Sequence, residues 1–326
     1  MVKANKSKYQ LVVSHVTDRI KSEEYRTGDR IPSINEFRST YNLSRDTVFA
    51  GLRELMAKGI IDSNHGVGYF ITSTETRSAH HIFLLFNELN EFKEDLFNSF
   101  MQAVGNFATV DLYFHNYNRK VFETLINDAN NKYTDYVIMS GKFYGIEPLL
   151  QTLSGRVFLL DHFHPELNGK YSSVAQNFEK DTYEALVSAV DLIRKYKRIF
   201  MVQMEEKEPL ERYDGLKSFC REHGLGHEYL SATGSRRISE GDLFIVVKDR
   251  DLVDLLKQAA LQLLIPGIDF GIISYNDTPL KELLAEGITT LSTDFTRMGE
   301  TMAGLIRTKG ISTIENPWKL NIRKSL

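Results

Sequence analysis

The chain has 326 residues, of which 42% are hydrophobic and 25% are charged, and this ordinary composition excludes a disordered or fibrous protein. The net charge of −3 excludes a polycation, but residues 1–72 carry eleven Lys/Arg against eight Asp/Glu. A mildly basic end on an acidic body indicates contact with nucleic acid by that end.

The cysteine count and the lengths of the apolar runs indicate in which cell compartment the protein is found. Cys220 is the only cysteine, so no intrachain disulfide can form and a reducing environment is expected. The start of the chain, MVKANKSKYQ, lacks the apolar segment of a secretory signal. Apolar runs such as HIFLLF are too short to span a bilayer. We therefore expect a cytoplasmic protein without membrane contact.

The first 72 residues predict three helices followed by a hairpin. Apolar residues recur at helical spacing in the first helix: Tyr9, Val12, Val13, Val16 and Ile20. Ser33 and Glu36 have the spacing of a capping box and open a second helix that runs to about Tyr41. Ser44 caps the third helix, which Gly59 ends. The hairpin follows in IIDSNHGVGYFI, with its turn at Asn64, His65 and Gly66.

The small, polar residues 73–80 predict a linker. After it, the sequence changes to apolar runs that alternate with helical stretches. Apolar runs typical of buried strands occupy 81–86, 110–114, 135–140, 156–161, 172–177, 198–204, 242–247 and 270–276. Helical stretches lie between or after them, at 94–105, 119–131, 178–196, 208–223, 249–264 and 296–307. This alternation predicts parallel sheets covered on both faces. About 245 residues suit two similar α/β lobes, with ligands bound between them at the carboxyl ends of strands.

Three helices and a hairpin are the plan of a winged helix-turn-helix domain, whose third helix enters the major groove of DNA. Arg45 can pair with a guanine or a phosphate, and Asp46 can accept from cytosine or favour the helix dipole. Ser44, Thr47 and the free backbone N–H groups can donate to phosphates. The predicted DNA contacts are Ser33, Ser44, Arg45, Asp46, Thr47, Asn64, His65 and Gly66.

These residues carry a specific resemblance. The segment from Gly28 to Ile71 is similar to the DNA-binding domain of the GntR family of bacterial transcription regulators. The matching elements are Gly28, Ile31-Pro32-Ser33, Leu43-Ser44-Arg45-x-Thr47-Val48, Leu52-x-x-Leu55-x-x-x-Gly59 and Gly66-x-Gly68-x-Phe70. Asn35 and Phe49 stand where that family often has basic residues. The resemblance therefore implies fewer cationic contacts with DNA here. Recognition of the DNA sequence would depend more on Arg45 and on the hairpin, which is the wing of this fold.

The remaining residues show no catalytic constellation. There is no G-x-S-x-G elbow and no G-x-x-x-x-G-K-[ST] phosphate loop. The run HFHPE at 162–166 is either a metal fragment without a third histidine or, as we favour, a solvated or ligand-facing loop. Cys220 has no activating base beside it, so a buried inert thiol is expected. No cofactor or metal is expected.

Residues 81–310 resemble, more weakly, the effector domain of LacI-type repressors and periplasmic sugar-binding proteins. The resemblance rests on Tyr275-Asn276-Asp277 at a strand end, followed by Ile288-Thr289-Thr290 through Met298-Gly299. Together with the GntR-like head and the polar linker, it implies an α/β fold overall: a winged helix-turn-helix domain at 1–72, a linker at 73–80 and a two-lobed periplasmic-binding-protein-like domain at 81–326 that binds effector and dimerises.

The resemblance also implies ligand-binding positions. They are Asn90, Phe92, Asp161, His162, Phe163, Arg212, Lys248, Asn276 and Asp277. Asn276 replaces the family's usual aspartate. Lys248 replaces an asparagine, which suggests a different or more anionic ligand. Alternatives remain open: Arg212 can pair with Glu208 or Glu211, Lys248 can pair with Asp249, and Asp277 can be a structural turn acceptor.

Together these patterns predict a sugar-responsive transcription regulator, a homodimeric repressor of carbohydrate metabolism that resembles the arabinose-repressor type. Its partners would be double-stranded operator DNA and a monosaccharide or sugar phosphate, for instance a pentose or deoxyhexose such as arabinose or fucose. Two alternatives come from other classes: an α/β sugar-modifying enzyme fused to a DNA-binding head, and a DNA-binding dimer that needs no effector.

Overall fold

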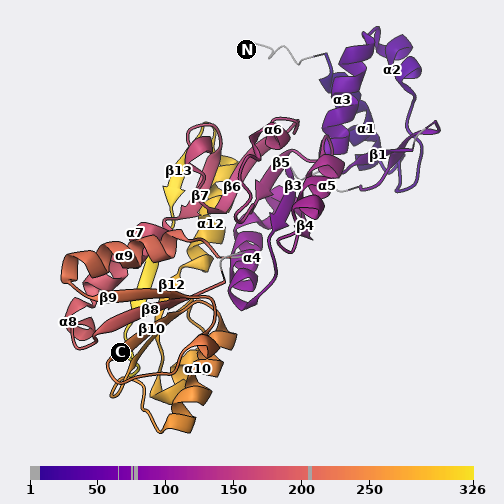
Figure 1. Cartoon of the computed structure of the whole chain (residues 1–326). Coiled ribbons are helices and arrows are strands. Elements are labelled where there is room, and N and C mark those ends of the chain that lie inside the picture. The colour runs from indigo at the N-terminus through magenta and orange to yellow at the C-terminus, as the bar shows by residue number, and fades with distance from the viewer. Residues whose placement is uncertain (1–7, 65, 75, 77–79, 205–207) are drawn as a thin grey trace, which may run out of the picture.

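The computed structural model describes residues 8–64, 66–74, 76, 80–204 and 208–326, and it consists of a small head and two α/β lobes (Figure 1). The predicted fold class is confirmed. Of the predicted linker, residues 75 and 77–79 lie outside the described part of the chain. The head contains α1 (Gln10–Lys21), α2 (Ile34–Tyr41), α3 (Arg45–Ala57), β1 (Ile61–Asn64) and β2 (Gly68–Ile71), with the two strands paired antiparallel.

Local signals determine where the head's helices begin and end. Ser33 and Glu36 form a complete capping box at the start of α2, and the Ser44 side chain accepts from the Thr47 backbone N–H at the start of α3. The helices then pack through fully buried aliphatic residues on α1 and α3. Gly51 permits this close approach, because a Cβ there would lie 2.7 Å from the Cβ of Val12.

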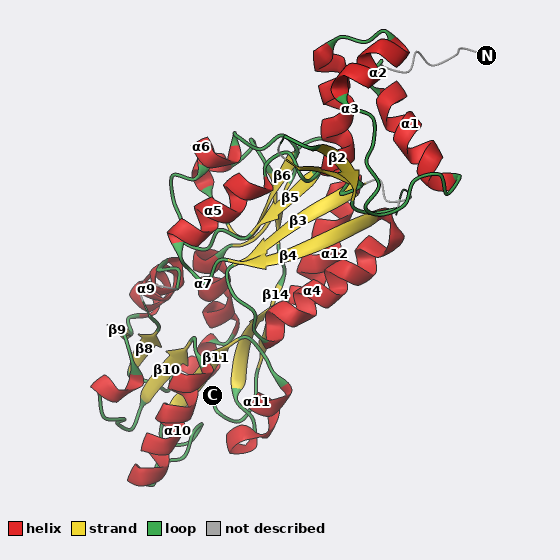
Figure 2. Cartoon of the chain, turned by 90° about the vertical axis from the view of Figure 1, so that its right-hand side faces the viewer, coloured by secondary structure: helices red, strands yellow, loops and turns green. Residues whose placement is uncertain are grey.

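The N-lobe is built on a six-stranded parallel sheet with the strand order β13-β7-β6-β5-β3-β4. Its strands are β3 (His80–Phe86), β4 (Ala108–Phe114), β5 (Asp135–Ile138), β6 (Arg156–His162), β7 (Ser172–Gln176) and β13 (Thr313–Glu315). The helices α4 (Glu91–Val104) and α12 (Phe295–Arg307) cover one face and pack against each other (Figure 2). The helices α5 (Arg119–Ala129) and α6 (Glu147–Leu150) cover the other face.

The C-lobe has a second six-stranded sheet with the order β14-β12-β11-β10-β8-β9, in which only the pairing of β14 is antiparallel. Its strands are β8 (Arg198–Val202), β9 (Gly226–Leu230), β10 (Asp242–Val246), β11 (Gly271–Tyr275), β12 (Thr289–Thr293) and β14 (Trp318–Asn321). One face carries α7 (Phe178–Ser188), α8 (Val190–Ile193) and α9 (Glu211–His223). The other face carries α10 (Asp249–Gln262), and α11 (Pro279–Leu283) follows β11.

The chain passes between the lobes three times: from β7 to α7, from β12 to α12, and from β13 to β14. Side chains tie these passages together. Gln176, at the end of β7, bonds Thr293 at the end of β12, and Asn316 donates to the Asp294 carbonyl at 3.0 Å. Three adjacent passages with few residues each are the form of a hinge, which lets two lobes rotate without breaking either sheet.

Most predicted elements are present, and the differences lie at edges. The predicted helix 178–196 is divided into α7 and α8 at Ala189. The edge strands β9, β13 and β14 were not predicted. They are three to five residues long and contain only one buried residue among them, so they lack the apolar run that marks a central strand. Described helices include none that is both long and apolar enough to cross a membrane.

Asp181 on α7 is a buried carboxyl whose Oδ1 has no hydrogen-bond partner among the described residues. Burial, with the charge of Glu315 nearby, raises the pKa of Asp181 from 3.8 to about 7. A raised carboxyl pKa means that the folded protein holds the proton more tightly, so stability falls as the pH rises from about 4 to 7.

We therefore expect Asp181→Asn to raise the melting temperature at pH 8, where the wild-type carboxylate is ionised, and to change it little near pH 4. Thermal denaturation across this pH range checks the prediction. Asp191→Asn is the control, because Asp191 is exposed on α8 beside Arg194. An equal effect of Asp181→Asn at both pH values would contradict the assignment.

Candidate functional site

The head contains an open groove of about 620 Å³ between the starts of α2 and α3 and the β1–β2 hairpin. It is lined by Arg30, Ser33, Ile34, Asn35, Arg38, Arg45, Ser63, Asn64, Gly66, Val67, Gly68 and Tyr69. Four of the predicted DNA contacts line it, namely Ser33, Arg45, Asn64 and Gly66. Ser44, Asp46 and Thr47 lie beside it on the first turn of α3, and His65 lies outside the described residues.

Three arginines face this groove, and two of them were not predicted. Arg38 comes from α2, and Arg30 lies against the hairpin, where a Cβ on Gly68 would be 3.0 Å from its Nε. None of Arg30, Arg38 and Arg45 forms an ion pair within the described residues. The groove is therefore cationic despite Asn35 and Phe49. The missed signal was the pair of arginines flanking the capping box of α2.

Phe49 supports Arg45 rather than merely replacing a basic residue. The guanidinium of Arg45 lies 5.5 Å from the centre of the Phe49 ring, one helical turn further along α3. Such a contact restricts the arginine side chain while its polar edge stays free to donate. Ser44 and Thr47 have a different role, because their hydroxyls bond each other at 2.7 Å and cap the helix.

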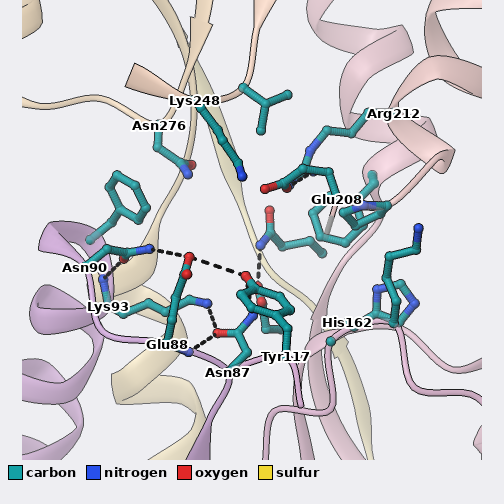
Figure 3. Close-up of a pocket in the computed structure, with 18 of the residues that line it drawn as sticks. Asn87, Glu88, Asn90, Lys93, Tyr117, His162, Glu208, Arg212, Lys248 and Asn276 are labelled. Carbon is teal, nitrogen blue, oxygen red and sulfur yellow. Dashed lines mark hydrogen bonds and ion pairs between the residues drawn. The ribbon is translucent and has the colours of Figure 1, made fainter. Parts of the chain in front are cut away.

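A second cavity, of about 330 Å³, lies between the lobes at the carboxyl ends of the strands (Figure 3). It is lined by Asn87, Glu88, Asn90, Phe92, Lys93, Tyr117, Gly141, Lys142, Asp161, His162, Gln176, Phe178, Glu208, Pro209, Arg212, Val247, Lys248, Asp249, Asn276 and Phe295. We call it the interlobe cleft. Seven of the nine predicted ligand positions line it; Phe163 and Asp277 do not.

Two of the predicted residues that line the cleft have a strained backbone conformation. Asp161 and Asn276 have φ angles of 77° and 60°, in the left-handed region that side chains other than glycine seldom adopt. Strain of this kind persists where surrounding contacts hold it, and it is concentrated at functional sites. At Asn276 the contacts come from Lys281, whose Nζ donates to the carbonyls of Tyr275 at 2.8 Å and Asn276 at 2.7 Å.

Lys281 also links this strand end to the neighbouring helix. It is 1% exposed, and its Nζ lies 2.7 Å from Asp249 Oδ1 at the start of α10. One buried ammonium group thus joins Asn276 to the segment that carries Lys248. Sequence reasoning did not find Lys281, because its spacing on a short amphipathic helix is typical of an exposed lysine.

We expect Lys281→Met to destabilise the protein by about 2–4 kcal/mol, because two carbonyls and a carboxylate lose a charged donor at a buried position. The same change should weaken ligand binding, since Asn276 loses its support. Thermal denaturation and calorimetric titration measure the two effects. Lys324→Met is the control, because Lys324 and its partner Glu286 are both exposed, so both measurements should stay at wild-type values.

Arg212 is held in the cleft by two aromatic rings and one carboxylate. Its guanidinium lies 4.3 Å from the centre of the Phe178 ring and 4.8 Å from that of Tyr275, and it donates to Glu208 at 2.8 Å. The predicted alternative, an ion pair with Glu208, is therefore present, but the arginine also lines the cleft. Its Nε is buried and has no hydrogen-bond partner among the described residues.

The N-lobe side of the cleft contributes groups that the sequence did not single out. Lys93, on the first turn of α4, is buried and bonds Asn87. Burial lowers the pKa of Lys93, and the nearby carboxylates of Asp161 and Glu88 oppose that shift. Burial and Glu88 raise the pKa of Tyr117, whose hydroxyl remains a donor. Gln176 and Glu208 also line the cleft and were not predicted as ligand positions.

Asp277 points away from the cleft into a structural ion pair. Arg323 donates to its two oxygens at 2.7 and 2.8 Å, and Asn321 donates at 2.9 Å. Burial disfavours ionisation of Asp277, but the hydrogen bonds from Arg323 outweigh it and lower the pKa. These contacts fit the alternative of a turn acceptor. Phe163 is partly buried beside the cleft.

The histidines of HFHPE lie at and behind the cleft wall. Burial and the neighbouring His164 lower the pKa of His162 to about 4, so its ring is neutral at neutral pH. His164 Nε2 lies 2.5 Å from Ser140 Oγ, and its Nδ1 lies 3.2 Å from Glu166. The series Glu166–His164–Ser140 resembles the arrangement that activates a catalytic serine. Ser140 is only 1% exposed and does not line the cleft, so no substrate reaches it here.

The described residues contain no group of three or more His, Cys, Asp or Glu side chains arranged to hold a metal ion. Cys220 is 1% exposed, and burial raises its pKa to about 12, which makes it an inert thiol at neutral pH.

The sequence of the head matches a known family. The family described as "Bacterial regulatory proteins, gntR family" matches residues 8–71, and a periplasmic binding protein-like domain matches residues 192–317. The head is a GntR-family helix-turn-helix domain. It is joined to a body of the periplasmic-binding-protein type.

Among curated relatives of this GntR-type head, the histidine utilization repressor of Klebsiella aerogenes is 35% identical over 71 residues, which are 22% of this chain and 30% of that protein. The chain spans less than a third of the length of the curated relatives it matches. The likeness to these relatives is therefore confined to the head.

The body resembles solved structures of LacI-family regulators. One from Silicibacter pomeroyi has a TM-score of 0.63 and 18% identity, over 76% of this chain and 98% of that one. Another, from Enterococcus faecium with bound ribose, has a TM-score of 0.61 and 17% identity, over 75% of this chain and 98% of that one. At such identity the likeness shows the fold of the body.

Proposed function

We propose that this chain is a transcription regulator, a repressor of sugar-utilisation genes that binds operator DNA through its head and a monosaccharide in the interlobe cleft. One observation carries the proposal: a cationic groove at the start of α3 and a polar cleft between hinged lobes occur in the same chain. The first suits the phosphates and base edges of a duplex. The second suits a small ligand whose binding changes the angle between lobes.

In this proposal the N-terminal end of α3 enters the major groove, with Arg45 pairing a base edge and Ser44, Asp46 and Thr47 beside it. Arg30 and Arg38 contact phosphates, and Ser33 adds a hydroxyl at the start of α2. The hairpin with Asn64 and Gly66 lies along the adjacent backbone as a wing.

The charge of the cleft favours an uncharged sugar over a sugar phosphate. Its lining contains four Lys/Arg and four Asp/Glu: Lys93, Lys142, Arg212 and Lys248 against Glu88, Asp161, Glu208 and Asp249. A sugar phosphate would add a charge of about −1.5 to −2 to this balanced set. Sugar hydroxyls, by contrast, both donate and accept, and the carboxylates and cations here supply both kinds of partner.

The size and apolar parts of the cleft point to a small sugar. A cavity of about 330 Å³ is at the lower end of the range of ligand sites, which suits a monosaccharide. Phe92 and Phe295 are stacked with their ring centres 5.6 Å apart, and with Phe178 they offer an apolar wall for a ring face or a deoxy methyl group. A pentose or a 6-deoxyhexose, such as arabinose or fucose, fits this description. The solved relative from E. faecium contains ribose.

Regulation would follow from rotation of the lobes about the three passages. A ligand that binds one lobe arrangement better than the other shifts the population toward it. In a homodimer working in the cytoplasm, the shift would change the spacing of two heads and hence the affinity for a two-site operator.

The test combines DNA binding with an effector panel. Fluorescence anisotropy would measure binding of the full chain to the DNA upstream of its own gene, with and without pentoses, 6-deoxyhexoses and their phosphates. We expect tight, salt-dependent binding that an uncharged sugar changes and its phosphate does not. The same sugar should raise the melting temperature.

Other outcomes assign the chain differently. No thermal shift with any member of the panel, together with DNA binding, would favour an effector-independent DNA-binding dimer. Chemical conversion of a sugar by the purified protein would favour an enzyme with a DNA-binding head. Absence of DNA binding at low salt would remove the regulator assignment.

A further inference from the structure

The helix α12 runs from the interlobe cleft to the end of the N-lobe that carries the head (Figure 2). Its first residue, Phe295, lines the cleft and stacks on Phe92. The residue before it, Asp294, lies in the hinge, where its carbonyl accepts from Asn316 at 3.0 Å. Thirteen helical residues span roughly 20 Å, so the two ends of α12 contact different parts of the protein.

The helices α12 and α4 pack so closely that a shift of one is passed to the other. A Cβ on Gly299 would lie 2.5 Å from the Leu96 carbonyl oxygen, and Arg307 donates to a carbonyl of α4 at 2.8 Å. Both helices begin at the cleft, since Phe92 and Phe295 line it. A ligand in the cleft therefore lies against the first turns of a paired unit whose other end is close to the head.

Arg156, the first residue of β6, holds the far end of α12. Its guanidinium donates to the Ile306 carbonyl at 2.7 Å and to the Thr308 carbonyl at 3.1 Å. Its Nε donates at 2.8 Å to Asp135, which is fully buried. The last carbonyls of a helix have no partner within the helix, so one arginine satisfies two of these groups while it neutralises a buried carboxylate.

Asp135 extends this connection to the strand that follows the head. Its Oδ2 accepts from the Thr134 hydroxyl at 2.6 Å and lies 2.6 Å from Nδ1 of His80, the first residue of β3. The next residue, His81, touches the head, since a Cβ on Gly59, just after α3, would lie 2.8 Å from its ring. A continuous set of contacts therefore joins the interlobe cleft to the end of α3.

The C-lobe contains a similar arginine without the helix contacts. Arg198, the first residue of β8, lies 5.1 Å from the centre of the Phe200 ring and pairs with buried Asp242 at 3.3 Å. Arg156 lies over the Phe158 ring in the same way, at 5.2 Å. Within the described part of the chain, however, Arg198 donates to no helix carbonyl. A buried aspartate alone does not require an arginine that also reaches a helix, and the added contacts occur in the lobe that carries the head.

We propose that Arg156 is the positioning residue that couples the interlobe cleft to the head, because it locks the end of α12 to β3. Rotation of the lobes about the hinge displaces the start of α12, and helix shifts of about 1–2 Å are typical of such transitions. The planar fork of Arg156 holds the carboxylate and both carbonyls at once, so the shift reaches Asp135 and the head. The inference rests on the proposed function, whose effector response it explains.

Arg156→Lys tests the coupling in the full chain, because a lysine keeps the charge beside Asp135 but cannot replace the planar fork. Fluorescence anisotropy measures operator affinity with and without saturating arabinose, fucose or ribose. Effectors typically change such affinities by about 5- to 150-fold, and we expect this coupling factor to fall to within about 2-fold of one in Arg156→Lys. Binding of DNA alone and of sugar alone should stay near wild-type values.

Arg198→Lys is the matched control, because it makes the same change beside a buried aspartate at a strand start. It should lower the melting temperature about as much as Arg156→Lys does and leave the coupling factor unchanged. Linkage supplies a second readout: DNA should change sugar affinity by the same factor in the wild type and hardly at all in Arg156→Lys. A purely structural role for Arg156 would move the melting temperature alone.

Hydrogen exchange supplies a measurement that needs no sugar. Operator DNA should slow amide exchange in the last turn of α12 in the wild type and not in Arg156→Lys. A wild-type coupling factor in Arg156→Lys, equal protection by DNA in both proteins, or loss of coupling in Arg198→Lys would overturn the inference. The proposed function fails separately: if no sugar binds, the proposed effector is removed, and the exchange measurement still decides whether Arg156 couples α12 to the head.

Discussion

Arg45→Ala is expected to weaken operator binding by about 1–3 kcal/mol, or roughly 5- to 150-fold, if Arg45 reads a base. The side chain is exposed on the first turn of α3, lines the head groove and is steadied by the Phe49 ring at 5.5 Å. It forms no ion pair with a described residue, so its donors are available to DNA. Fluorescence anisotropy at matched ionic strength measures the loss.

Control variants distinguish the loss of a contact to a base from the loss of a positive charge anywhere on the protein. Arg221→Ala removes one positive charge from α9, where Arg221 is exposed and donates to Ser218 at 3.3 Å, and should leave binding unchanged. Arg30→Ala and Arg38→Ala should weaken binding to all sequences and reduce its dependence on salt, as loss of a phosphate contact does. Operator binding by Arg45→Ala at the wild-type level would remove Arg45 from the readout.

Arg212→Ala is expected to weaken effector binding roughly 30-fold or more, the cost of truncating one member of a buried charge pair. The substitution removes the guanidinium from the cleft wall and leaves the half-buried Glu208 without its 2.8 Å partner. Operator binding by the free protein should persist, because the head is untouched. Calorimetric titration with the effector and anisotropy with DNA measure the two properties separately.

Arg198→Ala is a matched control for the structural part of this effect. Arg198 also lies over a ring, 5.1 Å from the centre of Phe200, and pairs with buried Asp242 at 3.3 Å. It stands at the first residue of β8, whereas the cleft lies at the carboxyl ends of the strands. Its loss should therefore destabilise the lobe without changing effector affinity.

Asn276→Ala provides a second test of the cleft, because it removes one amide at the opposite wall and leaves the Arg212 ion pair intact. It should abolish the effector response with less loss of stability than Arg212→Ala. Normal responses from both variants would show that the effector binds elsewhere.

The head could be predicted almost completely from its sequence, because its signals act over a few residues. Ser33 with Glu36, and Ser44 with Thr47, satisfy backbone groups within three residues of themselves. Arg30 and Arg38 were missed for a different reason. Their positions on either side of the α2 capping box are visible in the sequence, but only the fold shows that both arginines line one groove with the hairpin.

The cleft residues likewise fall into those that a local pattern predicts and those that it does not. Asp161, Lys248 and Asn276 were found because polar residues at strand ends are recognisable in a parallel α/β pattern. Lys93 and Glu208 were missed, since a lysine on a first helical turn and a glutamate in a loop are usually solvated. Asp277 follows Asn276 directly, yet its partners Asn321 and Arg323 are 44 and 46 residues away, and these distant residues hold the carboxylate away from the cleft.

The sequence by itself determined the α/β class, the winged head and most strand ends, because helix caps, apolar periodicity and strand runs are set by neighbouring residues. Only the tertiary structure decided how the C-terminal segments return to the N-lobe. Thr313 pairs with Ser173, and Arg156 donates to the Ile306 carbonyl 150 residues away at 2.7 Å. Such partners are selected by packing among distant segments, which no local pattern encodes. The same packing brought Lys93 and Lys281 to their buried places beside the cleft.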